Sequence, residues 1–259
     1  MKLGIIQGRL LEPVGGNIQE FSFDRWEDEF ELINKLNLNH IEWIITDNSF
    51  NNNVLSINIS KYHTKVSSIC CDQLIHSTIT NIEFLKKQIL PVCEWAINNQ
   101  IKIINIPLLE ASELNENNKH ILISNFQIIS DLFPDLEFHF EIESSIDLCL
   151  ELVSTRNNFF LIYDTGNITS KLLDHVEWII KGHKYIKNVH LKDRTISPIK
   201  TVEPFTGDTD FKTIFETLRS INYNNFFTIQ TCRGETGREI DTIKNHIKKF
   251  VNLYNEKFI

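Results

Sequence analysis

The chain has 259 residues, of which 42% are hydrophobic and 23% are charged, a composition typical of a globular protein rather than a disordered one. Its formal net charge of −8 argues against a general nucleic-acid-binding protein, because phosphate binding requires clustered Lys and Arg that carboxylates do not dilute. The sequence has no apolar run of membrane-spanning length and no signal-peptide pattern at its start, so we expect a cytoplasmic protein without a membrane partner.

Eight short apolar runs occur along the chain, and each is followed by a helical pattern without a long linker. This alternation predicts an α/β protein, with a closed (β/α)8 TIM barrel formed by a single domain over residues 1–259. The length of the chain lies within the range of such a barrel. The eight runs are Leu3 to Gln7, His40 to Ile45, Lys65 to Cys70, Ile101 to Ile106, Glu137 to Glu143, Phe159 to Asp164, Ile186 to Lys192 and Asn225 to Gln230.

Apolar stripes with helical spacing mark the elements between these runs. Two of them lie between Trp26 and Leu36 and between Phe84 and Trp95. Asp210 precedes another stripe that starts at Phe211, and we expect it to cap a helix there. The segment from Glu239 to Tyr254 is expected to form the last helix of the barrel.

Polar and charged side chains follow each predicted strand at its carboxyl end, where a barrel of this kind places its active site. In chain order these residues are Gln7 and Arg9; Glu42 and Asp47; Cys71, Asp72 and His76; Glu110; Glu141 and Glu143; Asp164; His190; and Gln230 and Arg233. We expect substrate-binding roles for Gln7 and Arg9, and a contact with a substrate hydroxyl for Glu42.

The fifth strand alternates apolar residues with Glu137, His139, Glu141 and Glu143, so one of its faces is ionisable throughout. Four such groups inside a barrel are costly unless they are paired, hydrogen-bonded or bound to a metal. Glu137 and His139 fit a solvated entry to the strand. For Glu141 we favour the role of a metal ligand.

Glu141, Asp164 and His190 end three consecutive strands. Neighbouring parallel strands lie about 4.8 Å apart, so three such side chains can converge on one ion. Two carboxylates and an imidazole suit Mn²⁺, Zn²⁺, Co²⁺ or Mg²⁺. The sequence therefore predicts a divalent metal site formed by these residues.

Lys192 lies two residues after His190 and is expected on the same face of the strand. Its ammonium could neutralise negative charge that develops on a substrate, which would make it catalytic. Arg9, Arg194 and Arg233 are candidates for binding an anionic group through paired hydrogen bonds. Each of these arginines could equally pair with a neighbouring carboxylate.

Several runs resemble a known family. They are Tyr-Asp-Thr-Gly-Asn at 163–167, Val-His-Leu-Lys-Asp-Arg at 189–194, Gly-Asp-Thr-Asp-Phe at 207–211, and the segments at 3–10 and 41–44. The chain resembles the sugar phosphate isomerase/epimerase family of the xylose-isomerase-like TIM barrel superfamily, including L-ribulose-5-phosphate 3-epimerases. The likeness covers most of the chain, and the His-x-Lys-Asp block is its most specific part.

The resemblance implies a divalent metal held by Glu141, Asp164, His190 and the residue at position 230, and a substrate contact by Asn167. In the family the position that corresponds to 230 is a second Glu, whereas this chain has Gln230. An amide oxygen can ligate a metal but cannot accept a proton at neutral pH. The family's exchange of protons between two glutamates is therefore in doubt, and a single base, Glu141, or a route through Glu143 remains open.

A second departure lies in Pro204-Phe205-Thr206-Gly207, where relatives have two glycines and this chain keeps only Gly207. We expect a tight loop with a positive φ at Gly207.

The resemblance implies a divalent-metal-dependent isomerase or epimerase of a sugar or sugar phosphate, acting by proton transfer through a metal-stabilised enediolate. The expected partner is a small carbohydrate, with no nucleic acid, and homo-oligomerisation stays open. One alternative is a metal-binding barrel with lyase or dehydratase activity on a polyol-derived substrate. Another is a catalytically degenerate binding protein, which Gln230 suggests.

Overall fold

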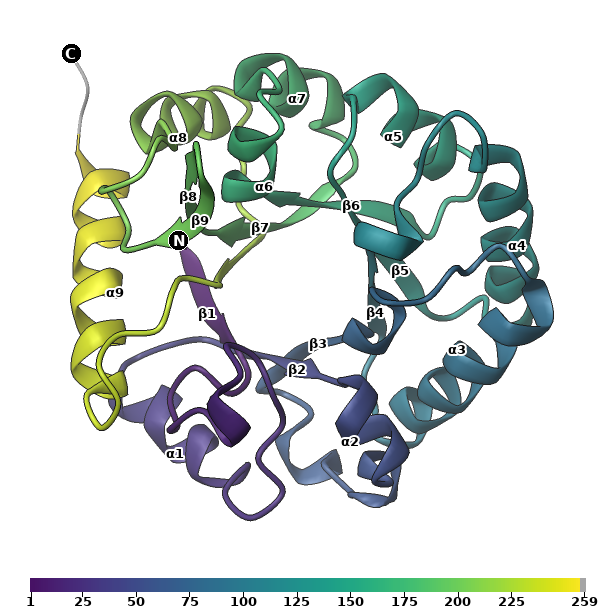
Figure 1. Ribbon diagram of the computed structural model, residues 1–259, viewed down its shortest axis with the longest axis horizontal. Coiled ribbons are helices and arrows are strands. Elements are labelled where there is room, and N and C mark those ends of the chain that lie inside the picture. Colours follow the sequence, from purple (N-terminus) through teal and green to yellow (C-terminus); the bar gives the residue numbers. More distant parts are fainter. Residues whose placement is uncertain (257–259) are drawn as a thin grey trace.

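The structure is a computed structural model that describes residues 1–256, and the last three residues of the expected domain, 257–259, lie outside the described part. Eight parallel strands form a closed barrel in the order β1-β10-β7-β6-β5-β4-β3-β2 (Figure 1). The predicted TIM barrel is confirmed. Its strands are β1 (Lys2–Ile6), β2 (Ile41–Ile44), β3 (Val66–Cys70), β4 (Ile103–Leu108), β5 (Glu137–Ile142), β6 (Phe159–Asp164), β7 (Ile186–Leu191) and β10 (Phe226–Ile229).

Helices form a ring around the barrel (Figure 1). They cover the outer faces of the strands, whose apolar side chains are almost entirely buried, as expected for parallel strands enclosed on both sides. None of the helices within residues 1–256 is long and apolar enough to cross a membrane. The helices are α1 (Asp28–Lys35), α2 (Asp47–Asn51), α3 (Ile82–Asn98), α4 (Lys119–Leu132), α5 (Ile146–Val153), α6 (Thr165–Ser170), α7 (His175–Gly182), α8 (Phe211–Ser220) and α9 (Glu239–Asn255).

The helix α8 begins where the sequence predicts it. The Asp210 carboxylate accepts hydrogen bonds from the backbone N–H of Thr213 at 3.1 Å and from its hydroxyl at 2.7 Å. A side chain at this position satisfies a backbone donor that the helix itself leaves unpaired. The buried rings of Phe211, Phe215 and Phe250 then pack α8 against α9.

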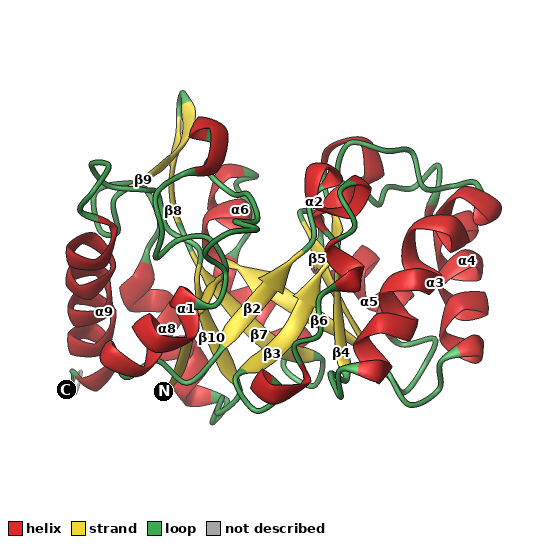
Figure 2. Ribbon diagram, turned by 90° about the horizontal axis from the view of Figure 1, so that it is seen from below, coloured by secondary structure: helices red, strands yellow, loops and turns green. Residues whose placement is uncertain are grey.

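A short antiparallel hairpin of β8 (Asp193–Ile196) and β9 (Ile199–Val202) follows β7 and is not part of the barrel. Figure 2 shows it projecting beyond the barrel on the side where the strands end. The buried Asp193 carboxylate holds the chain after the hairpin by accepting the N–H groups of Thr206 at 3.1 Å, Gly207 at 2.9 Å and Thr209 at 3.2 Å.

The expected positive φ at Gly207 is wrong. The left-handed residue of this loop is Phe205, with φ of 71°. Gly207 is required for space, because a Cβ there would lie 2.4 Å from the Asp193 carboxylate. The close approach of backbone to carboxylate, rather than a turn conformation, accounts for the glycine.

The inward face of β5 is polar throughout, as the alternation predicts. Glu137 is partly exposed at the entry to the strand, whereas His139 is 2% exposed and lies 3.0 Å from the Glu137 carboxylate. The expectation of a solvated entry thus holds for Glu137 and is wrong for His139, whose ring is buried by the closed barrel. Glu141 lies further along the strand, towards its carboxyl end.

Two buried histidines outside β5 are held neutral. His40 contacts the Thr228 hydroxyl at 3.1 Å, and His246 contacts the Thr231 hydroxyl at 2.9 Å. Burial lowers the pKa of each ring to about 4. In the unfolded chain both rings titrate near the ordinary value, so acid favours unfolding through them.

We therefore expect the stability contribution of these rings to be complete above about pH 6.5 and to be lost as the pH falls towards 4. Each ring then costs on the order of 3 kcal/mol at pH 4. Chemical denaturation at a series of pH values should show that the free energy of unfolding falls less steeply with decreasing pH for His40→Gln than for the natural chain. His183→Gln, which replaces an exposed ring, is the control, and equal slopes for all three proteins would contradict the expectation.

Candidate metal centre

A cavity of about 490 Å³ opens at the carboxyl ends of the strands, which is the end where TIM barrels carry their sites. Its volume suits a small ligand. We call it the mouth cavity. Its walls carry six carboxylates and three basic side chains, namely Glu20, Asp47, Asp72, Glu110, Glu141 and Glu143, and Arg9, Lys192 and Arg194.

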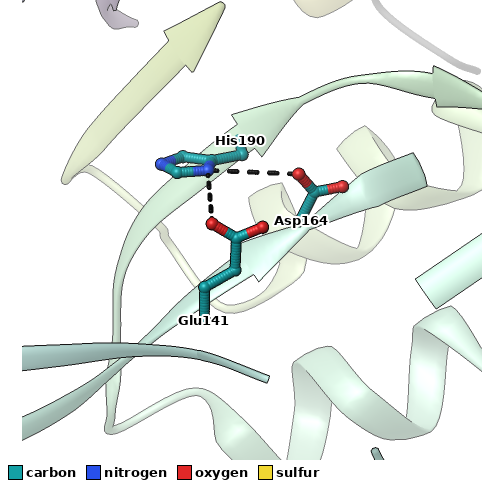
Figure 3. A group of neighbouring side chains, drawn as sticks. All are labelled: Glu141, Asp164 and His190. Atoms are coloured by element: carbon teal, nitrogen blue, oxygen red, sulfur yellow. Dashed lines mark ion pairs between the residues drawn. The ribbon is translucent and has the colours of Figure 1, made fainter. Parts of the chain in front are cut away.

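Glu141, Asp164 and His190 converge beside this cavity from β5, β6 and β7 (Figure 3). One ligand atom from each lies within 4.8 Å of the other two. The imidazole Nδ1 of His190 is 3.2 Å from the Glu141 carboxylate and 4.0 Å from that of Asp164. The strand register places Asp164 directly beside His190. We call these three residues the metal triad.

The other ring nitrogen of His190 faces Glu42, a residue of β2 that is completely buried. The distance from Nε2 to the Glu42 carboxylate is 3.2 Å, and the Asn188 amide donates to the same oxygen at 3.0 Å. Burial opposes a charge on the ring, but Glu42 and Glu141 together raise the pKa of His190 to about 10. Glu42 therefore fixes the orientation of the ring and leaves Nδ1 directed at the two carboxylates of the triad.

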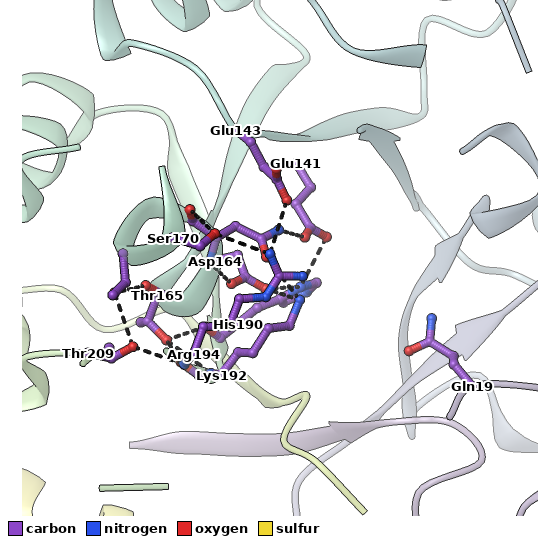
Figure 4. A network of polar contacts seen from close by, with 12 residues as sticks. Gln19, Glu141, Glu143, Asp164, Thr165, Ser170, His190, Lys192, Arg194 and Thr209 are labelled. Atoms are coloured by element: carbon purple, nitrogen blue, oxygen red, sulfur yellow. Dashed lines mark hydrogen bonds and ion pairs between the residues drawn. The ribbon is translucent and has the colours of Figure 1, made fainter. Parts of the chain in front are cut away.

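Lys192 and Asn167 complete the polar network around the triad (Figure 4). The Lys192 ammonium lies 2.8 Å from the Asp164 carboxylate. Burial opposes ionisation of Asp164, yet Lys192 and His190 hold the pKa of this carboxyl below its usual value. The Asn167 amide donates to Glu141 at 2.9 Å, and its oxygen accepts from Lys192 at 3.3 Å.

The donors of this site fit a divalent cation. Within residues 1–256, Nδ1 of His190, Oδ2 of Asp164 and Oε1 of Gln230 are buried atoms without a hydrogen bond of good geometry, although Glu141 lies 3.2 Å from the first and Lys192 lies 2.8 Å from the second. Buried polar atoms are rarely left in this state unless a ligand takes them up. Carboxylate, imidazole and amide donors are those that Mn²⁺, Zn²⁺, Co²⁺ and Mg²⁺ accept.

Five of the residues given a catalytic, metal-binding or substrate-binding role from the sequence line the mouth cavity: Glu141, Lys192, Gln230, Arg9 and Arg194. Other strand-end residues singled out in the sequence line it as well, namely Asp47, Asp72, His76, Glu110 and Glu143. Arg194 lies 3.2 Å from the Ser170 hydroxyl and 3.7 Å from the Glu143 carboxylate. Arg9 donates to the carbonyl of Ile18 and to the Gln19 side chain. Both arginines thus have partners within the protein. Of the two, Arg194 has a carboxylate partner, which is one of the two roles considered from the sequence.

The remaining residues given a catalytic, metal-binding or substrate-binding role do not line the cavity. Asp164, His190, Asn167 and Glu42 are buried next to it, and the buried Gln7 accepts the N–H of Ile44 at 3.1 Å. Arg233 donates to the carbonyls of Gly8, Leu11 and Ile18. It joins the loop after β10 to the loop after β1, and its expected role in binding an anion stays a prediction.

The cavity also contains loop residues that the sequence did not single out. Gln19 donates to the Asp72 carboxylate at 3.2 Å, and Glu20 accepts from the Thr46 hydroxyl at 2.5 Å. Gln19 and Glu20 belong to the long loop between β1 and α1, which has no periodic pattern. Only the tertiary contacts of this loop bring them to the cavity, so no local signal could have identified them.

Comparison with known proteins supports the same architecture. The family model described as xylose isomerase-like TIM barrel matches residues 132–250, which include the metal triad and Lys192. The fold is that of a xylose isomerase-like TIM barrel. The resemblance to this superfamily is thereby confirmed. A comparison with curated proteins finds no match.

Solved structures of similar fold include the IolI protein with a bound zinc atom, at 16% identity and a TM-score of 0.78, covering 100% of this chain and 99% of that one. An L-ribulose 3-epimerase has 13% identity and a TM-score of 0.71, with 97% and 93% covered. The probable 3-DHS dehydratase AsbF from Bacillus anthracis has 14% identity and a TM-score of 0.69, with 97% and 99% covered. At these identities the similarity concerns the fold of the chain.

The contact between Glu42 and His190 can be tested in the metal-free protein. Glu42→Gln removes the charge but keeps an oxygen for the ring, so the pKa of His190 should fall by roughly one to three pH units. NMR titration of the imidazole C–H signals measures the pKa. Glu110→Gln, at an exposed carboxylate of the cavity, should leave it unchanged. An unchanged pKa of His190 in Glu42→Gln would contradict the assigned contact.

Proposed function

We propose that the protein is a divalent-metal-dependent isomerase or epimerase that moves a proton on a carbon beside the carbonyl of a sugar. The observation that carries the proposal is the metal triad next to the mouth cavity, with Glu141 also lining the cavity itself. Structural neighbours that are epimerases, and one that binds zinc, support it as similarities of fold.

Glu141, Asp164 and His190 would hold the ion, with Gln230 as a neutral fourth donor. A bound divalent ion would polarise the carbonyl and hydroxyl oxygens of the substrate. The three charged residues come from rigid strands, so the site needs no loop to form it. Lys192 lies 2.8 Å from Oδ2 of Asp164, the oxygen that also faces His190, and its charge stabilises the ionised carboxylate.

Glu141 is the proposed base. Its Oε1 accepts the Asn167 amide, while Oε2 lies near His190, so the carboxylate is held in one orientation beside the cavity. A carboxylate positioned in this way can remove the proton from a substrate carbon and return it. The Lys192 ammonium lies in the same wall and can stabilise the negative charge that forms on the substrate oxygens.

The charge of the mouth cavity bears on the substrate. Its six carboxylates outnumber its three basic side chains. Lys192 is close to Asp164 and Arg194 is close to Glu143, so two of the three cations already have carboxylate partners. A phosphate group would add negative charge to an acidic cavity. We therefore favour an unphosphorylated sugar as the substrate.

The metal site has a direct test. The purified protein should bind about one equivalent of Mn²⁺ or Zn²⁺, and Asp164→Ala and His190→Ala should lose it because each removes a charged or imidazole donor. Elemental analysis by mass spectrometry after dialysis measures the metal content. His76→Ala, which removes an exposed imidazole at the rim of the cavity, is the matched control. Unchanged metal content in both triad variants would refute the site.

The chemistry is tested by proton exchange in D₂O with a panel of ketopentoses and ketohexoses and their phosphates. We expect deuterium to enter the carbon beside the carbonyl, with faster exchange for the free sugars. Glu141→Gln keeps an oxygen donor but cannot take a proton, so exchange should fall by about 10²- to 10⁴-fold. Glu110→Gln, on the same cavity, should retain the natural rate. NMR of the substrate follows both exchange and configuration.

Two outcomes would replace the proposal. Loss of water from the substrate, with formation of a double bond, would favour the dehydratase alternative, which the similarity to AsbF keeps in view. A natural chain that is inert on the whole panel, together with an active Gln230→Glu variant, would identify a degenerate site whose second base has been lost.

A further inference from the structure

Asp72 is a carboxylate of the mouth cavity that the metal triad does not use. It follows β3 and opens the short turn Asp72–Leu74. Its described hydrogen bond comes from the Gln19 amide, at 3.2 Å. Among the described ion pairs none involves Asp72, whereas Glu143 lies 3.7 Å from Arg194 and 3.5 Å from Lys171. Glu143 is thus paired with two cationic side chains, whereas Asp72 has no described ion pair.

The surroundings of Asp72 raise the pKa of its carboxyl towards neutral pH. Burial, followed by the charge of Glu141, raises the pKa of Asp72 to about 7, with Asp47 and Glu20 acting in the same sense and His76 opposing them. Arg9, on the loop after β1, is the other charged neighbour. A carboxyl in this range has both its acid and its base form available at neutral pH, as a proton-transfer group requires.

The position of Asp72 differs from that of Glu143. Glu143 follows Glu141 by two residues on the same strand end, so both come from one wall of the cavity. Figure 4 shows the Gln19 side chain across the barrel mouth from Glu141 and Glu143. Because Gln19 donates to Asp72, the Asp72 carboxylate lies on the Gln19 side of the cavity, after β3, which β4 separates from β5 in the barrel. Inverting a carbon requires groups on two sides of it, and Gln230 cannot supply the second one.

We propose that Asp72 is the second proton-transfer residue of the site, acting on the face of the substrate carbon opposite Glu141. The inference rests on the proposed function. Glu141 takes the proton, the C–H electron pair forms the carbon–carbon double bond of an enediolate, and the π pair of the neighbouring carbonyl moves onto its oxygen. The carbonyl then re-forms as the electron pair of the carbon–carbon double bond takes the proton of the protonated Asp72 on the other side of the same carbon, and the configuration inverts. Exchange of protons with water returns both carboxyls to their starting states.

The test compares Asp72→Asn with the natural chain in D₂O, using the free ketopentoses and ketohexoses that the natural chain exchanges. Inversion should fall by about 10²- to 10⁴-fold, while deuterium still enters with retention of configuration through Glu141. Glu110→Gln, at an exposed carboxylate of the same cavity, should invert at the natural rate. Asp72→Glu should recover part of the inversion, which a merely structural role would not predict.

Other results separate the two proposals. Inversion at the natural rate in Asp72→Asn would overturn the role of Asp72 and leave the proposed function intact. Loss of exchange and inversion in equal measure, in a variant with the natural metal content and melting temperature, would also overturn it. If Asp72→Asn does not fold, Asp72→Ser takes its place with the same criteria. A natural chain that exchanges no sugar on the panel would instead refute the proposed function itself.

Discussion

The imidazole of His190 lies between two buried carboxylates, and the polar groups at the carboxyl ends of the strands are arranged around it. Glu42 is 3.2 Å from one ring nitrogen and Glu141 is 3.2 Å from the other. Isolated charges at such depth would be prohibitively costly. The site is stable only because each carboxylate has a partner: His190 for Glu42 and Glu141, Lys192 for Asp164, and the amides of Asn188 and Asn167. A rigid network of this kind fixes side-chain positions closely enough for chemistry.

The closed barrel is what makes this arrangement possible. Glu42 and His190 are 148 residues apart in sequence, yet both side chains point into a lumen that β2 and β7 share. An open sheet in the same strand order would leave β2 far from β7, and the histidine would lack its second carboxylate. Closure of the sheet between β1 and β10 therefore matters for the electrostatics of the site as much as for the core.

The sequence allowed the strand residues of the site to be placed together, whereas it gave no sign that Gln19 and Glu20 of the loop after β1 belong to the cavity. Glu141, Asp164 and His190 could be placed together because the pleat and the spacing of parallel strands fix where such side chains point. The β8–β9 hairpin and the contact of Gln19 with Asp72 depend on tertiary contacts that have no local pattern. The expectation of a positive φ at Gly207 was wrong because the glycine is needed for space beside the buried Asp193 carboxylate, which belongs to another segment of the chain.

Charge balance shows how Gln230 would fit the proposed metal site. Glu42, Glu141 and Asp164 carry three negative charges beside His190, against which Lys192 supplies one positive charge. A divalent cation, bound with the imidazole neutral, would bring the buried network to neutrality. A second glutamate at position 230 would add one more negative charge. The amide of Gln230 would therefore not oppose metal binding, because its oxygen can ligate an ion, but it cannot take a proton. A reaction that inverts a carbon must then draw its second proton from another wall of the cavity.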